Sequence, residues 1–174
     1  MIKLVNKKGV YNVDKPVIGI PKALLYHRYY KGWKVFFEEL DCELIESNSS
    51  TKDIVDRGVK VAEEEACLPV KLFLGHVEYL KDKVDYIFVP RIVSVQKNEF
   101  LCPKFLGLPE MVESSIEQLP ELIDVTVNLR KNKINLIKAV MKITKQLDKS
   151  YYQGIRAFLK GSIAFKNHLK SLES

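Results

Sequence analysis

Two cysteines, Cys67 and Cys102, are placed where their thiols could do chemistry. Each is followed within two residues by a proline in a segment that reads as the start of a helix. A proline in the first turn removes no intrahelical hydrogen bond, and the free N–H groups and dipole of a helix N-terminus stabilise a thiolate. Lys71 and Lys104 add positive charge nearby. We therefore predict that the two thiolates bind a metal or attack an electrophile, with both lysines tuning the charge.

The other residues with metal-binding side chains fit a structural role better. Cys42 begins an apolar segment, and a free cysteine there usually behaves as a small buried hydrophobe. His76 lies inside a helical run, where a core or surface histidine is more common than a ligand. The separation between Cys67 and Cys102 fits no zinc or ferredoxin template. From spacing alone, two ordinary reduced cysteines remain as good an interpretation as a metal or redox site.

The elements that must position these residues are indicated by short apolar runs, typical of strands, that alternate with helical patterns. The pattern predicts an α/β fold, with a Rossmann-like or flavodoxin-like open parallel sheet of about four strands and helices on both faces. An aromatic stripe, of which Trp33 is one member, should place the first helix against the core. The expected strands are residues 17–20, 42–45, 86–89 and 123–127, and the expected helices are 25–40, 52–65, one containing 72–80, 133–147 and one from 151 almost to the end.

Loops at the carboxyl ends of the strands are the expected place for function. Open α/β sheets bind ligands at that edge, and both cysteine segments can reach it, Cys102 from a long loop predicted over residues 91–101. Hydroxyl-bearing residues 47–51 are expected to cap the helix that follows. The first strand leads into Gly19-Ile20-Pro21-Lys22, which matches neither dinucleotide nor P-loop fingerprints. Nucleotide binding therefore has no support from these motifs.

Composition indicates a globular cytoplasmic protein. The length of 174 residues suits one Rossmann-like domain over residues 1–130 carrying both cysteine motifs, followed by a helical extension over 131–174. The formal charge of +6 is spread along the chain without a nucleic-acid motif, and no apolar run is long enough for a bilayer, so neither nucleic acid nor membrane is an expected partner. Three cysteines without a secretory signal argue against a disulfide framework.

The last expected helix carries an apolar seam that predicts a packing surface. Ile155, Phe158, Phe165, Leu169 and Leu172 recur at spacings of three and four, interrupted by a serine. Packing within the domain is the simpler interpretation. The alternative is that the seam docks another domain or subunit.

Four segments together indicate a family. They are residues 18–24 (IGIPKAL), 65–71 (EACLPVK) with Gly75-His76, 85–91 (DYIFVPR) and 102–109 (CPKFLGLP). In these segments, and in order over roughly residues 17–170, the chain resembles the acyl-CoA dehydratase activase-related proteins. That family is related to the cluster-bearing subunits of 2-hydroxyglutaryl-CoA dehydratase and to the double-cubane cluster proteins.

The resemblance implies a function that spacing alone does not. It implies that Cys67 and Cys102 hold an iron–sulfur cluster, for instance [4Fe–4S], for low-potential electron transfer or reduction in anaerobes, beside Lys71 and Lys104. Members of this family carry a second Rossmann-like domain that supplies a further cysteine. We therefore expect half of a site, in a fragment or split-gene half, completed by another domain, a partner subunit or a homodimer, with an ATP-dependent activase as a further partner.

Two alternatives remain open. In the first, the chain is a non-catalytic α/β interaction module with inert cysteines. In the second, basic side chains at the strand ends (Lys22, Lys71 and Arg91) bind acyl-CoA, an idea that draws on family analogy alone.

Overall fold

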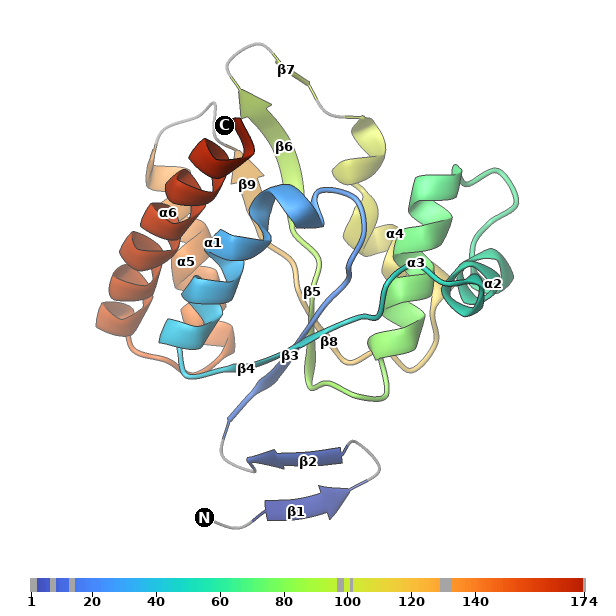
Figure 1. The fold of residues 1–174 in the computed structure, drawn as a ribbon, viewed down its shortest axis with the longest axis horizontal. Helices are drawn as coiled ribbons and strands as arrows, with labels where there is room; N and C mark the ends of the chain where they lie inside the picture. The colour runs from blue at the N-terminus through green and yellow to red at the C-terminus, as the bar shows by residue number, and fades with distance from the viewer. Residues whose placement is uncertain are drawn as a thin grey trace.

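The fold consists of a parallel sheet between two layers of helices (Figure 1). The computed structural model describes residues 3–6, 9–12, 15–96, 99–100, 102–128 and 133–173. The strands are β1 (Lys3–Asn6), β2 (Gly9–Asn12), β3 (Val17–Ile20), β4 (Glu43–Glu46), β5 (Tyr86–Phe88), β6 (Arg91–Gln96), β7 (Glu99–Phe100), β8 (Glu121–Ile123) and β9 (Thr126–Asn128). The helices are α1 (Tyr26–Glu39), α2 (Lys52–Val61), α3 (Leu68–Leu80), the 3₁₀ turn η1 (Pro103–Phe105), α4 (Leu108–Ser115), α5 (Lys133–Gln146) and α6 (Tyr151–Glu173).

The central sheet confirms the predicted α/β class. Its four strands are all parallel, in the order β4-β3-β5-β8. Every residue of β3 is buried, as expected for a strand covered on both faces. The chain moves from β3 outward to β4 and then crosses back to β5 on the other side. The order of the strands therefore reverses between β3 and β5.

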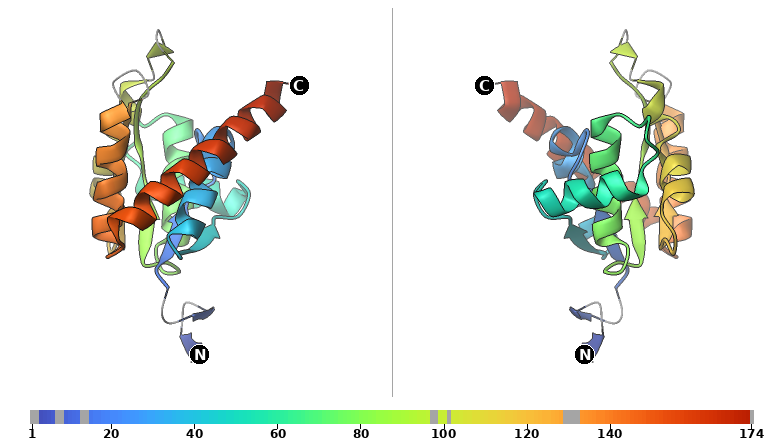
Figure 2. Two further views of the ribbon diagram at one scale, coloured as in Figure 1. Left: turned by 90° about the vertical axis from the view of Figure 1, so that its left-hand side faces the viewer. Right: turned by 90° about the vertical axis from the view of Figure 1, so that its right-hand side faces the viewer.

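Successive residues of each strand face opposite layers, which produces two hydrophobic cores. Ile18 and Phe88 face α1, α5 and α6, where they pack in one cluster with Phe37 and Ile143. Val17 and Ile87, the residues just before them, face α2, α3 and α4 and belong to a second, largely aliphatic cluster. Figure 2 views these two layers from their outer sides.

The segment after β5 differs from the prediction. Residues 91–101 were expected to be a loop, but β6 and β7 lie there, and β6 pairs in parallel with β9 in a three-stranded second sheet. The expected fourth strand over 123–127 is likewise divided into β8 and β9. Pro90 explains one break, because it has no N–H to donate. The chain continues to pair around it, since Arg91 N donates to Val125 O at 2.9 Å.

Two local expectations are also corrected, and one element is new. The helix expected over 52–65 ends at Val61, because Ala62 adopts an extended conformation. Thr51 is the N-cap of α2 but makes no side-chain cap hydrogen bond, and Ser47 Oγ instead accepts a hydrogen bond from Lys22 N at 2.8 Å. The antiparallel hairpin of β1 and β2 was not anticipated.

The C-terminal helices pack against the sheet domain. α6 lies across α1 at a close crossing between Gly161 and Gly32, and Ala157 there is fully buried. Val140 of α5 belongs to the same core as Ile18 of the central strand. Of the predicted seam, Phe158 packs against this core and Phe165 stacks on Tyr29 of α1, whereas Leu172 is exposed. Among the described residues, no helix combines the length and apolar character needed to cross a membrane.

Candidate functional site

Cys67 occupies the helix N-terminus predicted for it. It is the N-cap of α3, with extended dihedral angles, and a proline stands in the first turn. Its carbonyl oxygen accepts hydrogen bonds from Val70 N at 2.9 Å and Lys71 N at 3.0 Å, which closes that turn. The residue is exposed and its thiol is free. Cys67 is thus a solvent-accessible cysteine at the start of a buried, thirteen-residue helix.

Cys102 lies in a weaker version of this arrangement. It is the N-cap of η1, a 3₁₀ turn of three residues, and Gly107 separates that turn from α4. The predicted helix therefore does not start at Cys102, because only this short turn follows it and α4 begins at Leu108. Cys102 is nevertheless exposed and free like Cys67.

The fold brings both cysteine segments to the same edge of the sheet. α3 and the segment that leads into α4 both begin on the side where β3 and β5 end (Figure 1). This edge is the one at which open α/β sheets bind ligands. Within the described ranges, however, no group of three or more His, Cys, Asp or Glu residues could hold a metal ion. Two accessible thiols share an edge without forming a complete ligand set.

The two predicted lysines differ in their surroundings. Lys71 Nζ donates to the carbonyl oxygen of Glu64 at 3.0 Å, so its ammonium group holds the loop that leads to Cys67. Lys104 lies within η1 and is half-buried. Lys71 is therefore a positioning residue for the segment that carries Cys67.

Arg91 holds the Cys102 segment in a comparable way, a role that its sequence context did not show. Its Nη1 donates to Leu106 O at 2.9 Å and to Glu110 Oε2 at 2.6 Å. Its Nε and Nη2 both donate to Asp124 Oδ2, at 3.2 and 2.9 Å. One guanidinium thus links η1, α4 and the turn between β8 and β9. Because its donors are engaged, Arg91 is poorly suited to the acyl-CoA contact considered from sequence.

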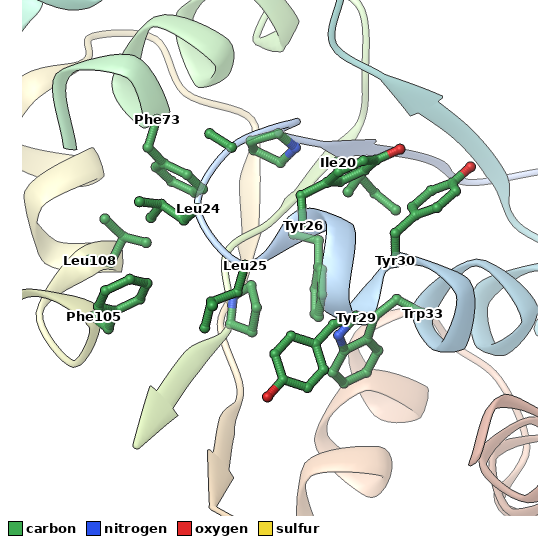
Figure 3. Close-up of a pocket in the computed structure, with 14 residues that line it drawn as sticks. Ile20, Leu24, Leu25, Tyr26, Tyr29, Tyr30, Trp33, Phe73, Phe105 and Leu108 are labelled. Carbon is green, nitrogen blue, oxygen red and sulfur yellow. The ribbon is translucent and has the colours of Figure 1, made fainter. Parts of the chain in front are cut away.

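A small apolar pocket opens where the strand order reverses. It has a volume of about 50 Å³ and lies between the ends of β3 and β5. Figure 3 shows aromatic side chains of α1 on one side, with Phe105, Leu108 and Phe73 across from them. Phe105 belongs to η1, the turn that Cys102 caps, so one element contributes to both the pocket and a thiol segment. Sequence patterns indicated the aromatic stripe but not the pocket.

Leu24 contributes a strained backbone to this pocket. Its φ of 55° lies in the left-handed region, which costs a non-glycine residue roughly 1–2 kcal/mol. The residue sits in the loop between β3 and α1, and its side chain lines the pocket (Figure 3). Such strain persists where surrounding structure enforces it, and it concentrates at ligand sites.

A charged cluster borders the pocket at the end of β4. Tyr26 and Tyr30, which line the pocket, both donate their hydroxyl hydrogens to the carboxylate of Glu46, and Lys22 Nζ lies 3.4 Å from it. Burial alone would raise the pKa of Glu46, but the bonds from the tyrosines and Lys22 outweigh it and lower that pKa. Burial and the hydrogen bond to Glu46 raise the pKa of both tyrosines. The cluster therefore holds an ionised carboxylate beside neutral phenols.

His76 is a buried polar residue on α3 near the same edge. It is fully buried, and its Nε2 lies 3.0 Å from Ser50 Oγ, while Nδ1 has no hydrogen-bond partner among the described residues. Burial, reinforced by the charge of Lys22, lowers the pKa of His76 to about 4. The imidazole is therefore neutral at physiological pH.

Cys42 is a buried cysteine, unlike the other two. It is 7% exposed and belongs to the core beneath α1. Burial raises the pKa of its thiol to about 11. A protonated, enclosed thiol of this kind is a packing group.

Comparison with known protein families gives one result. A family model described as CoA enzyme activase uncharacterised domain (DUF2229) matches residues 17–174. This confirms the resemblance to acyl-CoA dehydratase activase-related proteins. Comparisons with curated proteins and with solved structures found no match.

Proposed function

The chain belongs to the family of the CoA enzyme activase uncharacterised domain, and from this membership we propose that it is an iron–sulfur-cluster-binding domain. It would serve low-potential electron transfer or reduction in a system of the 2-hydroxyacyl-CoA dehydratase class. The observation that carries the proposal is the presence of two exposed, free cysteines on segments that begin at the ligand-binding edge of the sheet.

The donor set fits part of such a cluster. Iron–sulfur clusters are commonly held by four cysteine thiolates, and Cys67 and Cys102 would supply two of them. The remaining ligands would come from another domain or subunit, such as a dehydratase component. A cluster bound there would supply one-electron chemistry at low potential.

The residues around the thiols would prepare this half-site. Lys71 and Arg91 fix the two segments through bonds to backbone carbonyl oxygens, which limits how far either thiol can move. The apolar pocket beside η1 would keep water from one side of the site. Hydrogen bonding and solvent exposure set the reduction potential of a cluster, so these surroundings would give a bound cluster a defined reduction potential.

Anaerobic reconstitution tests the proposal. Protein incubated with ferrous iron and sulfide and then desalted should retain iron and a broad visible absorbance, and the double variant Cys67→Ala/Cys102→Ala should lose both. The matched control is Cys42→Ala, because it also removes a thiol but from the core. Iron retention that is equal in the double variant and the parent protein would reject ligation by these cysteines.

A second candidate function is a non-catalytic interaction module. It is favoured by the exposed apolar side chains Tyr152, Leu159 and Ile163 on α6. Under this alternative the protein retains no iron after reconstitution, even when a candidate partner is present. The thiols of Cys67 and Cys102 would then be accessible but without a role.

A further inference from the structure

The two helical layers differ in net charge, although lysines occur throughout the sequence. Residues 133–173, which form α5 and α6, contain nine Lys and Arg against only Asp148 and Glu173. Residues 47–85 and 102–120, which contain α2, α3 and α4, hold eleven Asp and Glu against seven Lys and Arg. The two layers cover opposite faces of the sheet (Figures 1 and 2). We therefore call the layer of α5 and α6 the basic face and the layer of α2, α3 and α4 the acidic face.

The charged groups of the basic face are accessible. Lys166 and Lys170 on α6 are exposed, as are Lys138 and Lys145 on α5. Arg156 and Lys160 are also exposed, although Glu39 binds both of them, Arg156 at 2.9 Å and Lys160 at 2.7 Å. The positive charge of this layer thus points largely to solvent.

The acidic face presents a matching tract. Glu63, Glu64 and Glu65 are consecutive and exposed in the loop between α2 and α3, immediately before Cys67. Most other acidic residues of this layer are exposed as well, among them Asp56 on α2 and Glu113 on α4.

Exposed large apolar side chains divide between the same two faces. The basic face has Met141, Tyr151, Tyr152, Leu159, Ile163 and Leu172, of which Tyr152 is 85% exposed. The acidic face has Val59, Leu68 and Leu106. Apolar anchors surrounded by charged residues are the usual composition of a protein interface.

We propose that the basic face of one copy of this chain docks on the acidic face of a second copy, in a head-to-tail arrangement. The apolar residues would supply affinity, and the opposite charges would supply orientation and specificity. The overall positive charge does not prevent this. At about 0.15 M salt the Debye length is about 8 Å, so repulsion between whole molecules is screened while close pairs still attract.

The arrangement would place α6 of one copy over the cysteines of the next. Leu68 directly follows Cys67, and Leu106 lies four residues beyond Cys102, so two of the three acidic-face anchors stand close to the cysteines in the chain. Because the two docking faces differ, the contact does not close into a two-fold dimer and can add further copies. Surface charge and exposed apolar side chains alone form this contact, so it does not require a bound cluster.

Sedimentation equilibrium on the metal-free chain tests the proposal. At about 0.15 M NaCl the weight-average mass should rise with protein concentration and pass twice the monomer mass, and about 1 M NaCl, where the Debye length is about 3 Å, should reduce it. The double variant Lys166→Glu/Lys170→Glu should weaken association roughly tenfold. The matched control Lys52→Glu/Lys60→Glu makes the same charge change on α2 of the acidic face and should not weaken it.

A charge swap and an apolar variant complete the test. Adding Glu63→Lys/Glu65→Lys to Lys166→Glu/Lys170→Glu should restore association, since the two faces are complementary again. Leu159→Ser/Ile163→Ser should weaken association without changing the charge.

Alkylation gives an independent measurement. Iodoacetamide should alkylate Cys67 and Cys102 several-fold more slowly in the associated protein. A monomer at every concentration and salt, association that stops at a dimer, or association that the α6 variants leave unchanged would overturn the proposal.

Discussion

Each helical layer contains a crossing at a pair of glycines, but the two crossings differ in closeness. A Cβ at Gly75 of α3 would lie 2.0 Å from Ile54 O of α2, and one at Gly58 would lie 1.9 Å from Lys71 O. At the other crossing, a Cβ at Gly32 of α1 would lie 3.0 Å from the Phe165 Cβ of α6. Backbone approaches backbone at both crossings, but less closely at the second, where a Cβ at Gly161 would lie 2.8 Å from Gly32 O and the side chain of Phe165 also takes part in the contact.

This difference shows how each layer is held in place. At the α2–α3 crossing, the atoms nearest to either added Cβ all belong to the backbone, so no side chain there can move aside. That geometry fixes the start of α3 and therefore Cys67. The α1–α6 pair is packed through aromatic rings, including Tyr29 stacked on Phe165 with centroids 5.3 Å apart. Aromatic packing can shift by tenths of an ångström, so this layer has more freedom.

The substitution Gly75→Ala should separate the two crossings most clearly. Because the new methyl would collide with a backbone carbonyl, we expect a loss of more than about 4 kcal/mol in the free energy of unfolding. Gly32→Ala, the matched change in the other layer, should cost only about 1–2 kcal/mol. Urea denaturation followed by circular dichroism measures both. Equal losses would contradict the contrast in closeness.

A second contrast is that, of the three histidines, all within the described ranges, only His76 of the α2–α3 layer is buried. The pKa of His76 is about 4 in the folded protein and about 6.5 when unfolded. Between these values the unfolded chain binds more protons, so stability should fall by about 3 kcal/mol as the pH is lowered from 6.5 to 4. Thermal unfolding at several pH values measures this. His76→Gln, which does not titrate, should remove most of the slope over that interval.

A third prediction compares the two cysteine segments. Arg91→Lys replaces a forked donor by a single ammonium, so the bonds to Asp124 and Leu106 O cannot all be kept. We expect a loss of about 1–2 kcal/mol in unfolding free energy. Peptide mapping after brief alkylation should show faster reaction at Cys102 and an unchanged rate at Cys67. An equal acceleration at both thiols would show that Arg91 does not act locally.

The smallest expected effect lies on the basic face. Glu39 binds Arg156 and Lys160 at the surface, and exposed ion pairs of this kind contribute little. Glu39→Gln should therefore change the free energy of unfolding by about 0.5 kcal/mol or less. A much larger loss would mean that ion pairs, rather than aromatic packing, hold α6 on α1.

The sequence was sufficient to predict the parts of the fold that local pattern determines. The buried run Val17–Ile20 and the aromatic stripe of α1 could be recognised because apolar residues repeat with the period of their element. Cys67 could be placed at a helix N-terminus because Pro69 marks the first turn. Predictions based on long-range pairing failed: β6 and β9 pair across more than thirty residues, so nothing local identifies their pairing.

The two exposed thiols could be found from the sequence, but the contacts around them could not. Cys67 and Cys102 stood out by their own surroundings in the sequence. The hydrogen bond from Arg91 to Leu106 O and the contact of Ser50 with His76 join segments far apart in the chain. No regular spacing in the sequence therefore marks these residues. The pocket beside Phe105 arises from three elements and has the same limitation.

The contact between α1 and α6 has a consequence for the protein during its synthesis. The aromatic residues of α1, such as Phe36, are made more than one hundred residues before α6, which covers them. At about 5–20 residues per second, the ribosome needs roughly 10 s to complete that stretch. During this time a partly built chain displays an apolar surface of α1 that α6 covers in the folded protein. A nascent chain of this kind is a natural client for chaperones that bind exposed aromatic segments.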